Sequence, residues 1–264
     1  MNVLSLFAGI GGIDLGLEWA GMRTVAFCER EPAAQFWLRE HWPGVPIYDD
    51  VRTLSGESLR RSDVGPIDVI AGGAPCQPFS VAGKQKGTED ERHLWPHFAR
   101  LIEEIRPRWV LAENVPGLRT IAADLVLEDL EKLGYTAWPL VVGASDVGAP
   151  HRRKRVWIVG ESTGPRLEGQ RADTGKSEEP ESRHSGAYRW PARPGEPQRE
   201  WEAPRLTKPG MGDSADGLPR WVAGYTSAHR REALNALGNA VVPQVVEIIG
   251  RGIMQIEKAM RGEA

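Results

Sequence analysis

Short runs of apolar residues recur through the first part of the chain, and segments with a different apolar spacing separate them. The runs predict strands at 3–7, 24–29, 45–50, 67–73, 108–115, 136–145 and 155–161. Helical spacing predicts helices through Ile13, Leu17 and Ala20, and at 32–42, 93–105 and 125–134. Most of the strands are almost continuously apolar, as strands buried on both faces are. The pattern therefore predicts an α/β fold with a mostly parallel sheet and helices on both faces.

The predicted strands bring several chemically distinctive segments to one edge of this sheet. Glycines follow the first strand, acids follow the second and third, a cysteine loop follows the fourth, and Glu-Asn-Val ends the fifth. Ligands of parallel sheets bind beyond the carboxyl ends of the strands. We therefore expect a ligand site at this edge, and the convergence of these segments argues for it more strongly than any single motif does.

Residues 161–220 differ in composition from the segment before them. They hold 8 Gly and 8 Pro, which is 16 of 60 residues, and this reaches the roughly 25–30% level of irregular chain. With few aliphatic residues, the segment cannot bury much by itself. It is either a flexible insertion or a segment that becomes ordered against a partner. Helical spacing returns within 233–260, where we expect a helix from Val242 onward that packs on the sheet domain.

Composition narrows the class of protein without naming a partner. The chain has 264 residues, a net charge of −3, two cysteines, and no apolar run as long as a membrane-spanning helix. Together with the lack of a signal-peptide pattern, this indicates a soluble cytoplasmic protein. The sequence has neither CxxC nor HExxH spacing, so no metal site is expected.

Charge is distributed unevenly along the chain. Residues 151–264 hold 19 Lys/Arg and 15 Asp/Glu, a net of +4, which leaves 14 and 21, a net of −7, in residues 1–150. The C-terminal part is therefore the better candidate for contact with a polyanion, unless the difference is chance variation in surface charge.

The first three strands end in residues that suit a nucleoside pocket. The glycine turn after the first strand contains Phe7, Gly9, Gly11 and Gly12. Such a turn lets the backbone approach a ligand at the start of a helix, although many are only tight connections. Glu29 could accept hydrogen bonds from ribose hydroxyls and Asp50 from an adenine amino group, but each alone could be a solvated loop acid. Asp14 stands where a dinucleotide fingerprint needs glycine, so the pocket fits a nucleoside without pyrophosphate, such as S-adenosylmethionine.

One of the two cysteines, Cys76, lies between prolines in APCQPFS (74–80). A free cysteine is commonly a small buried hydrophobic residue. The prolines would instead hold this loop rigid and aim a reactive thiolate at a substrate. Cys28, inside an apolar run, is expected in the core.

Two further segments place charge at the same edge. Glu113 ends the fifth strand, where burial would raise its pKa and let it act as a general acid; the alternative is an acid at the start of the following helix. HRRKR (151–155) precedes the last strand, and alternation sends Arg153 and Arg155 to the same side. Two guanidiniums there could hold a phosphate and a base carbonyl, whereas the alternative is a solvated basic turn.

Together these segments resemble the motifs of the DNA (cytosine-5)-methyltransferases. LFAGIGG resembles that family's first cofactor motif, GGAPCQPFS its catalytic loop, ENV its acid motif, HRRKR its Gln-x-Arg-x-Arg motif and GNAVVP (238–243) its last motif. They occur in the family's order and cover essentially residues 1–160 and 218–257. His151 stands where the family usually has glutamine, and Ser5 where many members carry aspartate.

The resemblance implies a Rossmann-like fold of the S-adenosylmethionine-dependent methyltransferases. It also implies methyl transfer from S-adenosyl-L-methionine to C5 of a cytosine flipped out of duplex DNA. Cys76 would attack C6 of the base, while Glu113 would contact N3 and the exocyclic amine. Arg155 would hold O2, and Arg153 would support the loop or a phosphate. The implied cofactor contacts are Phe7, Gly9, Gly11, Gly12, Glu29, Asp50, Val51, Pro75 and Asn239.

The resemblance also implies the organisation of the chain. We expect a cofactor-binding and catalytic domain at 1–160, a small target-recognition region at 161–220, and a segment at 221–264 that returns to the catalytic domain. The expected partners are double-stranded DNA and a cognate restriction enzyme, with no membrane, and the protein is expected to be a monomer. An RNA cytosine-5 methyltransferase and an inactive nucleic-acid-binding homologue are the alternatives.

Overall fold

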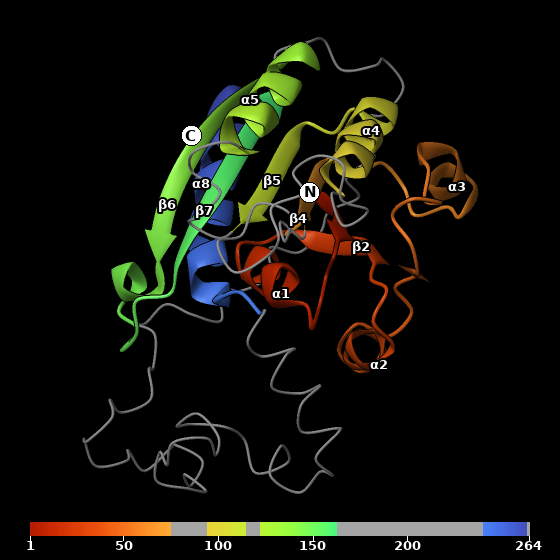
Figure 1. The fold of residues 1–264 in the computed structure, drawn as a ribbon, viewed down its shortest axis with the longest axis horizontal. Coiled ribbons are helices and arrows are strands. Elements are labelled where there is room, and N and C mark those ends of the chain that lie inside the picture. The colour runs from red at the N-terminus through yellow and green to blue at the C-terminus, as the bar shows by residue number, and fades with distance from the viewer. Residues whose placement is uncertain (75–93, 115–121, 163–239, 263–264) are drawn as a thin grey trace, which may run out of the picture.

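A computed structural model describes residues 1–74, 94–114, 122–162 and 240–262. The elements are β1 (Asn2–Leu6), α1 (Gly12–Trp19), β2 (Arg23–Cys28), α2 (Pro32–His41), β3 (Ile47–Tyr48), α3 (Gly56–Arg61), β4 (Val69–Gly72), α4 (Trp95–Ile105), β5 (Trp109–Asn114), α5 (Ala122–Lys132), β6 (Tyr135–Gly143), η4 (Ala144–Val147), β7 (Lys154–Ser162) and α8 (Pro243–Met260). Figure 1 shows their arrangement around one sheet.

The sheet has seven strands in the order β3-β2-β1-β4-β5-β7-β6. The strands β1 to β5 pair in parallel, which confirms the predicted mostly parallel sheet. β7 runs antiparallel to both β5 and β6, a direction that the apolar pattern does not predict. Only residues 144–153 separate β6 from β7, too few for the helical crossover that a parallel pair needs. The strand order reverses between β1 and β4, and such a switch point is where open α/β sheets bind ligands.

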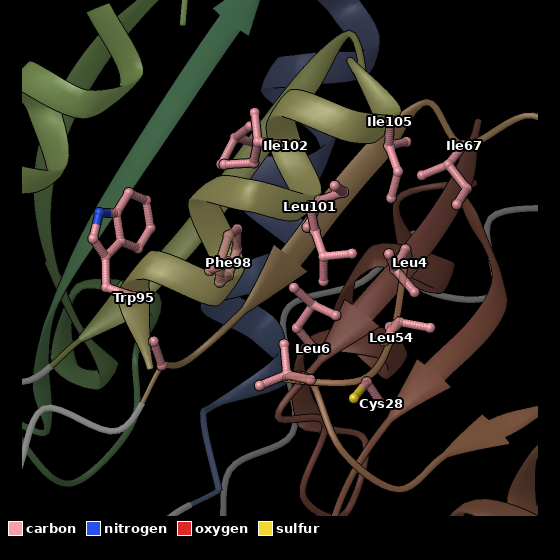
Figure 2. Packing of buried hydrophobic residues seen from close by; sticks show 14 of the residues in the cluster. Leu4, Leu6, Cys28, Leu54, Ile67, Trp95, Phe98, Leu101, Ile102 and Ile105 are labelled. Carbon is pink, nitrogen blue, oxygen red and sulfur yellow. The ribbon is translucent and has the colours of Figure 1, made fainter. Parts of the chain in front are cut away.

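Helices cover the two faces of the sheet. Alternate residues of a strand point to opposite faces, and in β1 Leu4 packs with α4 and α5 whereas Val3 packs with α1 and α8. Figure 2 shows Phe98, Leu101 and Ile105 of α4 pointing toward the sheet, close to Leu4 and Leu6 of β1. These layers confirm that helices cover both sides of the sheet at its parallel strands, whereas the outer strand β6 is exposed along most of its length.

Several local expectations are also confirmed. α4 begins at Trp95 with Pro96 in its first turn, where a proline costs no hydrogen bond. Cys28 is only 2% exposed and lies in the core, as expected. The helix α3 was not expected, because its six residues carry too few apolar positions to show a period. It begins at the N-cap residue Ser55, whose side chain accepts the N–H of Ser58.

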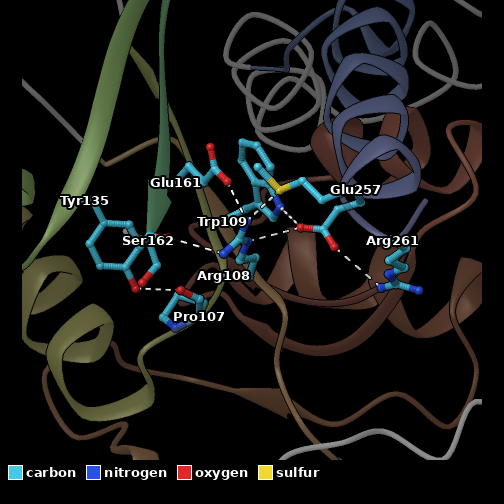
Figure 3. A network of polar contacts seen from close by, with 9 residues as sticks. Pro107, Arg108, Trp109, Tyr135, Glu161, Ser162, Glu257 and Arg261 are labelled. Carbon is cyan, nitrogen blue, oxygen red and sulfur yellow. Dashed lines mark hydrogen bonds and ion pairs between the residues drawn. The ribbon is translucent and has the colours of Figure 1, made fainter. Parts of the chain in front are cut away.

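The C-terminal helix α8 confirms the predicted closing helix and is attached at both ends. Near its start, Gly16 of α1 lets α8 approach closely, since a side chain there would meet Pro243 and Val246. Near its end, Glu257 accepts hydrogen bonds from Trp109 Nε1 at 2.8 Å and from Arg108 Nε at 3.2 Å. Figure 3 shows this network, in which Arg108 also pairs with Glu161 of β7. Arg108, just before β5, and Trp109, its first residue, thereby hold α8 at the edge opposite the predicted site.

Candidate functional site

The glycine turn after β1 has a left-handed backbone conformation at three of its residues. Phe7, Gly9 and Gly11 have φ values of 54°, 55° and 81°, all in the left-handed region. No atom lies within 4 Å of where a Gly9 side chain would begin, so the backbone there faces open space. At Gly11 a side chain would collide with the ring of Trp42. The sequence therefore builds a turn whose backbone a ligand can approach before α1 begins at Gly12.

Both oxygens of the Glu29 carboxylate are held by backbone groups. Oε2 accepts the N–H of Gly9 at 2.7 Å, and Oε1 accepts the N–H of Glu31 at 2.7 Å. Gln35 Nε2 donates to the backbone carbonyl of Glu29 at 2.7 Å. Because a carboxylate oxygen has two lone-pair sites, each oxygen can accept one more hydrogen bond. Glu29 is thus fixed next to the glycine turn and can accept from two hydroxyls, as a ribose would require.

Asp50 follows β3 at the same edge of the sheet. Both of its carboxylate oxygens accept from Arg52, whose Nη2 lies 2.5 Å from Oδ2. The hydrogen bonds from Arg52 lower the pKa of Asp50 to about 2, so the carboxylate is ionised and remains an acceptor. The neighbouring Val51 is 4% exposed and packs in the core. The cofactor contacts expected at the ends of β1, β2 and β3 therefore occupy one continuous edge.

Glu113 and the two arginines come together on the other side of the switch point. Glu113, the residue before the last of β5, lies opposite Trp157 of β7, and Arg155 lies two residues earlier on β7. Arg155 Nε is 2.8 Å from Glu113 Oε1 in an ion pair with less than a fifth of either side chain exposed. Arg153 is close enough to influence the same carboxylate. The structure therefore supports the predicted grouping and shows that the carboxylate itself is a direct contact of Arg155.

Burial dominates the electrostatics of this group. It raises the pKa of Glu113 above its usual value, although the charges of Arg155 and Arg153 oppose the shift. Burial, followed by the charge of Arg155, lowers the pKa of Arg153. A carboxyl with a raised pKa keeps its proton to higher pH and can donate it to a base. Arg153 also donates a hydrogen bond to the carbonyl of Ala240, just before α8, so it joins β7 to the C-terminal segment.

Asn114 and Gly73, for which no role was expected, contact or make room at the start of the cysteine loop. Asn114 Nδ2 donates to the carbonyl of Ala74 at 3.2 Å. A side chain on Gly73 would begin 2.8 Å from Glu113 Oε2, a distance that real contacts do not show. Asn114 and Gly73 stand inside the quoted motifs ENV and GGAPCQPFS, and that position is the only signal the sequence offers for them. The predicted residues Pro75, Cys76 and Asn239 lie outside the described residues, as does almost all of 161–220.

Metal sites and membrane-spanning segments are absent from the residues that the structure describes. Within them, no group of three or more His, Cys, Asp or Glu side chains could hold a metal ion. Among the helices that these residues form, none is long and apolar enough to cross a membrane.

The chain is similar in sequence to a known protein family and to curated proteins. The model of the family described as C-5 cytosine-specific DNA methylase matches residues 1–189. The type II methyltransferase M.NgoMIV of Neisseria gonorrhoeae is 41% identical over 161 residues, which are 59% of this chain and 50% of that protein. M.Eco47II of Escherichia coli is 42% identical over 165 residues, 60% of this chain and 39% of that protein. The chain spans about half the length of the curated relatives it matches.

Solved structures give the same family context. A prophage-encoded E. coli protein, described as a DNA modification methyltransferase, aligns with a TM-score of 0.53 at 33% identity, over 61% of this chain and 47% of that one. S. pombe Dnmt2 aligns with a TM-score of 0.53 at 20% identity, over 68% of this chain and 58% of that one. At 20% identity, the second likeness concerns the fold alone.

Proposed function

Because the chain belongs to the C-5 cytosine-specific DNA methylase family, we propose that it methylates C5 of cytosine in duplex DNA, with S-adenosyl-L-methionine as the methyl donor. The observation that carries this proposal is the buried Glu113–Arg155 pair beside Gly73 and Ala74, directly before the loop with Cys76. A nucleophile, an acid and two guanidiniums at one sheet edge suit addition to a pyrimidine ring.

The residues at the ends of β1 to β3 fit the cofactor. S-Adenosyl-L-methionine, when bound, supplies an electrophilic methyl group. Glu29 would accept the ribose hydroxyls through the lone pairs that Gly9 and Glu31 leave available. Asp50 would accept the adenine amino group, with Val51 behind it. Phe7, Gly9, Gly11 and Gly12 would line the turn, and Pro75 and Asn239 would contact the cofactor from the neighbouring segments.

The second half of the edge would activate the base. The Cys76 thiolate would add to C6 of the cytosine, forming the C6–S bond and making C5 electron-rich. Glu113 would donate its proton to N3 and accept from the exocyclic amine, which neutralises the charge that the addition creates. Arg155 would hold O2, while Arg153 would fix the C-terminal segment through Ala240. C5 would then take the methyl group, with S-adenosylhomocysteine as the leaving group, and N3 would return its proton to Glu113. Loss of the C5 proton to a base would restore the C5–C6 double bond, break the C6–S bond and release the Cys76 thiolate.

We assign the rest of the chain on the same basis. Residues 1–160 would form the cofactor-binding and catalytic domain, 161–220 a small target-recognition region and 221–264 the return to the catalytic domain. The enzyme would act in the cytoplasm as a monomer on a flipped cytosine. The description of the curated relatives as type II methyltransferases favours a cognate restriction enzyme as a partner.

A transfer assay with labelled methyl groups tests this proposal. Purified chain is incubated with labelled S-adenosyl-L-methionine and duplex DNA, with transfer RNA and a Cys76→Ser variant in parallel. We expect label at cytosine C5 of DNA for the unmodified chain and none for the variant. Transfer of label to RNA alone would show that RNA, and not DNA, is the substrate. Equal transfer by the variant would contradict the role of Cys76.

A further inference from the structure

The short loop that carries Asp50 and Val51 is held from a distant helix. Arg100 of α4 donates through Nη2 to the carbonyl of Val51 at 3.0 Å and to the carbonyl of Leu54 at 2.8 Å. Its other terminal nitrogen lies 2.6 Å from Glu104 Oε1, one helical turn along α4. One guanidinium therefore joins two backbone carbonyls of this loop to a helix some fifty residues away in the chain.

Glu104 extends the connection to the far end of the loop. Its second oxygen accepts the N–H of Gly56 at 2.8 Å, where α3 begins. Burial raises the pKa of Glu104, but the Gly56 N–H and Arg100 together lower it below its usual value. The Arg100–Glu104 pair thus contacts the loop at Val51, Leu54 and Gly56, and the carboxylate is ionised when it does so.

The loop itself is wound around Asp50, so its position sets that of the carboxylate. The backbone carbonyl of Asp50 accepts the N–H groups of Thr53 and Leu54, at 3.2 and 3.1 Å. The carboxylate of Asp50 accepts the N–H of Arg52 at 3.0 Å. These bonds are local and do not position the loop against the sheet. The buried side chains of Val51 and Leu54 hold the loop against the core. Arg100 adds two hydrogen bonds from α4, which is packed on the sheet through Phe98, Leu101 and Ile102.

We propose that Arg100 is a positioning residue for recognition of the adenine ring, acting by fixing the 50–54 loop and with it the Asp50 carboxylate. This inference rests on the proposed function, which places an adenine amino group against Asp50. Hydrogen bonds from a charged donor are stronger than those between neutral groups, and two such bonds link the loop to α4. Loss of both would let Asp50 move away from the position that reads the amino group.

Isothermal titration of the full-length chain with two nucleosides tests this inference. S-Adenosylhomocysteine carries the adenine amino group, whereas S-inosylhomocysteine has a carbonyl oxygen in its place, which the Asp50 carboxylate should repel. We expect the unmodified chain to prefer the first ligand by at least about tenfold. In Arg100→Met the preference should fall to about twofold or less, mainly through weaker binding of S-adenosylhomocysteine. Arg100→Lys, which keeps a donor, should retain an intermediate preference.

Arg61→Met is the matched control, because Arg61 and Glu57 form an i,i+4 pair on α3 that contacts no carbonyl of the loop. Its ligand preference should equal that of the unmodified chain. Thermal unfolding of every variant separates a folding defect from a recognition defect. A lower unfolding temperature for Arg100→Met with an unchanged preference would overturn the inference, since it would show a purely structural role. Binding of neither ligand by the unmodified chain would overturn both this inference and the cofactor assignment.

Discussion

Glu29 and Glu113 lie at the same edge of one sheet but are held in different ways. Backbone N–H groups hold both oxygens of Glu29, and these donors are fixed by the glycine turn and the start of α2. A side-chain guanidinium holds Glu113, in a buried environment that raises its pKa. The first arrangement holds a carboxylate as a fixed acceptor for hydroxyl groups. In the second, the raised pKa lets the carboxyl keep a proton to higher pH than an ordinary glutamate does. The comparison teaches that burial can raise the pKa of a carboxyl even beside a cationic partner that lowers it, whereas backbone donors fix a carboxylate as an acceptor.

The largest expected effect comes from Glu113→Gln, which keeps the shape of the side chain and removes its proton. Methyl transfer at saturating cofactor should fall by about 10²–10⁴-fold, the typical contribution of a general acid. Binding of S-adenosylhomocysteine should stay the same, because the glycine turn is untouched. Single-turnover transfer and titration measure the two quantities. An equally large loss of cofactor binding would mean that the Glu29 and Glu113 regions do not act independently.

The pH dependence of transfer tests the same region. Since the folded protein raises the pKa of Glu113, its protonated form persists to higher pH than that of an ordinary glutamate. The rate should therefore fall as pH rises through this raised pKa. In Glu113→Gln this limb of the profile should disappear, and an unchanged profile would assign the ionisation to another group.

Glu29→Ala should have the next largest effect, and on binding rather than on chemistry. The change removes the acceptors of two backbone N–H groups and, under the proposed function, of the ribose hydroxyls. We expect affinity for S-adenosylhomocysteine to fall by about 100-fold, while the rate at saturating cofactor changes far less. Titration and saturation kinetics check this. A fall in the saturated rate as large as that of Glu113→Gln would break the comparison.

Gly73→Ala should have a smaller effect, confined to the Glu113 region. The added methyl group would begin 2.8 Å from Glu113 Oε2, so the carboxyl must shift. We expect a loss of about tenfold in saturated rate, since small misplacements of catalytic groups cost up to about 10²-fold. Cofactor affinity should stay within twofold. Unchanged kinetics would show that the position of Glu113 is not critical.

A third carboxyl group, that of Asp14, should affect the stability of the fold and neither cofactor binding nor methyl transfer. Asp14 is fully buried, and the hydroxyls of Ser5 and Thr24 donate to it at 2.9 Å each. Burial raises its pKa from 3.8 to about 7, although these hydrogen bonds oppose the shift. The folded state then binds the proton more tightly than the unfolded state does. The contribution of Asp14 is therefore fully present below pH 3.8 and is lost as pH rises to about 7.

Asp14→Asn tests this assignment. The asparagine cannot ionise, so the slope of up to about 1.4 kcal/mol per pH unit that Asp14 contributes should vanish. Urea unfolding of both proteins between pH 5 and pH 8 measures the difference, which should increasingly favour the variant up to about pH 7 and then level off. An equal difference at all pH values would contradict the raised pKa. The hydroxyl of Ser5 donates one of the two hydrogen bonds that the carboxyl of Asp14 accepts.

The sequence predicts which segments are buried strands, and in what succession they occur, better than it predicts which residues contact each other. The strands, the parallel half of the sheet and the shared edge follow from apolar runs, because burial on two faces leaves a continuous pattern. The reversed direction of β7 leaves no such trace, since a buried strand has the same composition in either direction. The motif residues Glu29, Glu113 and Arg155 could be found because the motifs are specific.

Contacts across the fold could not be found in the same way. Arg100 has the spacing of an ordinary i,i+4 partner of Glu104, and nothing along the chain marks its bonds to Val51 and Leu54. The role of Asn114 depends on its 3.2 Å contact with Ala74, forty residues earlier in the chain. Such contacts depend on which strands and helices become neighbours, and that follows from the three-dimensional packing.

Trapping of a covalent complex tests the central claim most directly. In duplex DNA with 5-fluorocytosine, the fluorine cannot leave as a proton does, so methylated product should stay attached to Cys76. With cofactor present, the unmodified chain should give a denaturation-resistant protein–DNA complex, and Cys76→Ser should give none. Glu29→Ala should form the complex once the cofactor is saturating, whereas Glu113→Gln should form little at any cofactor concentration. A complex that both glutamate variants form equally well, or no complex with the unmodified chain, would contradict the account.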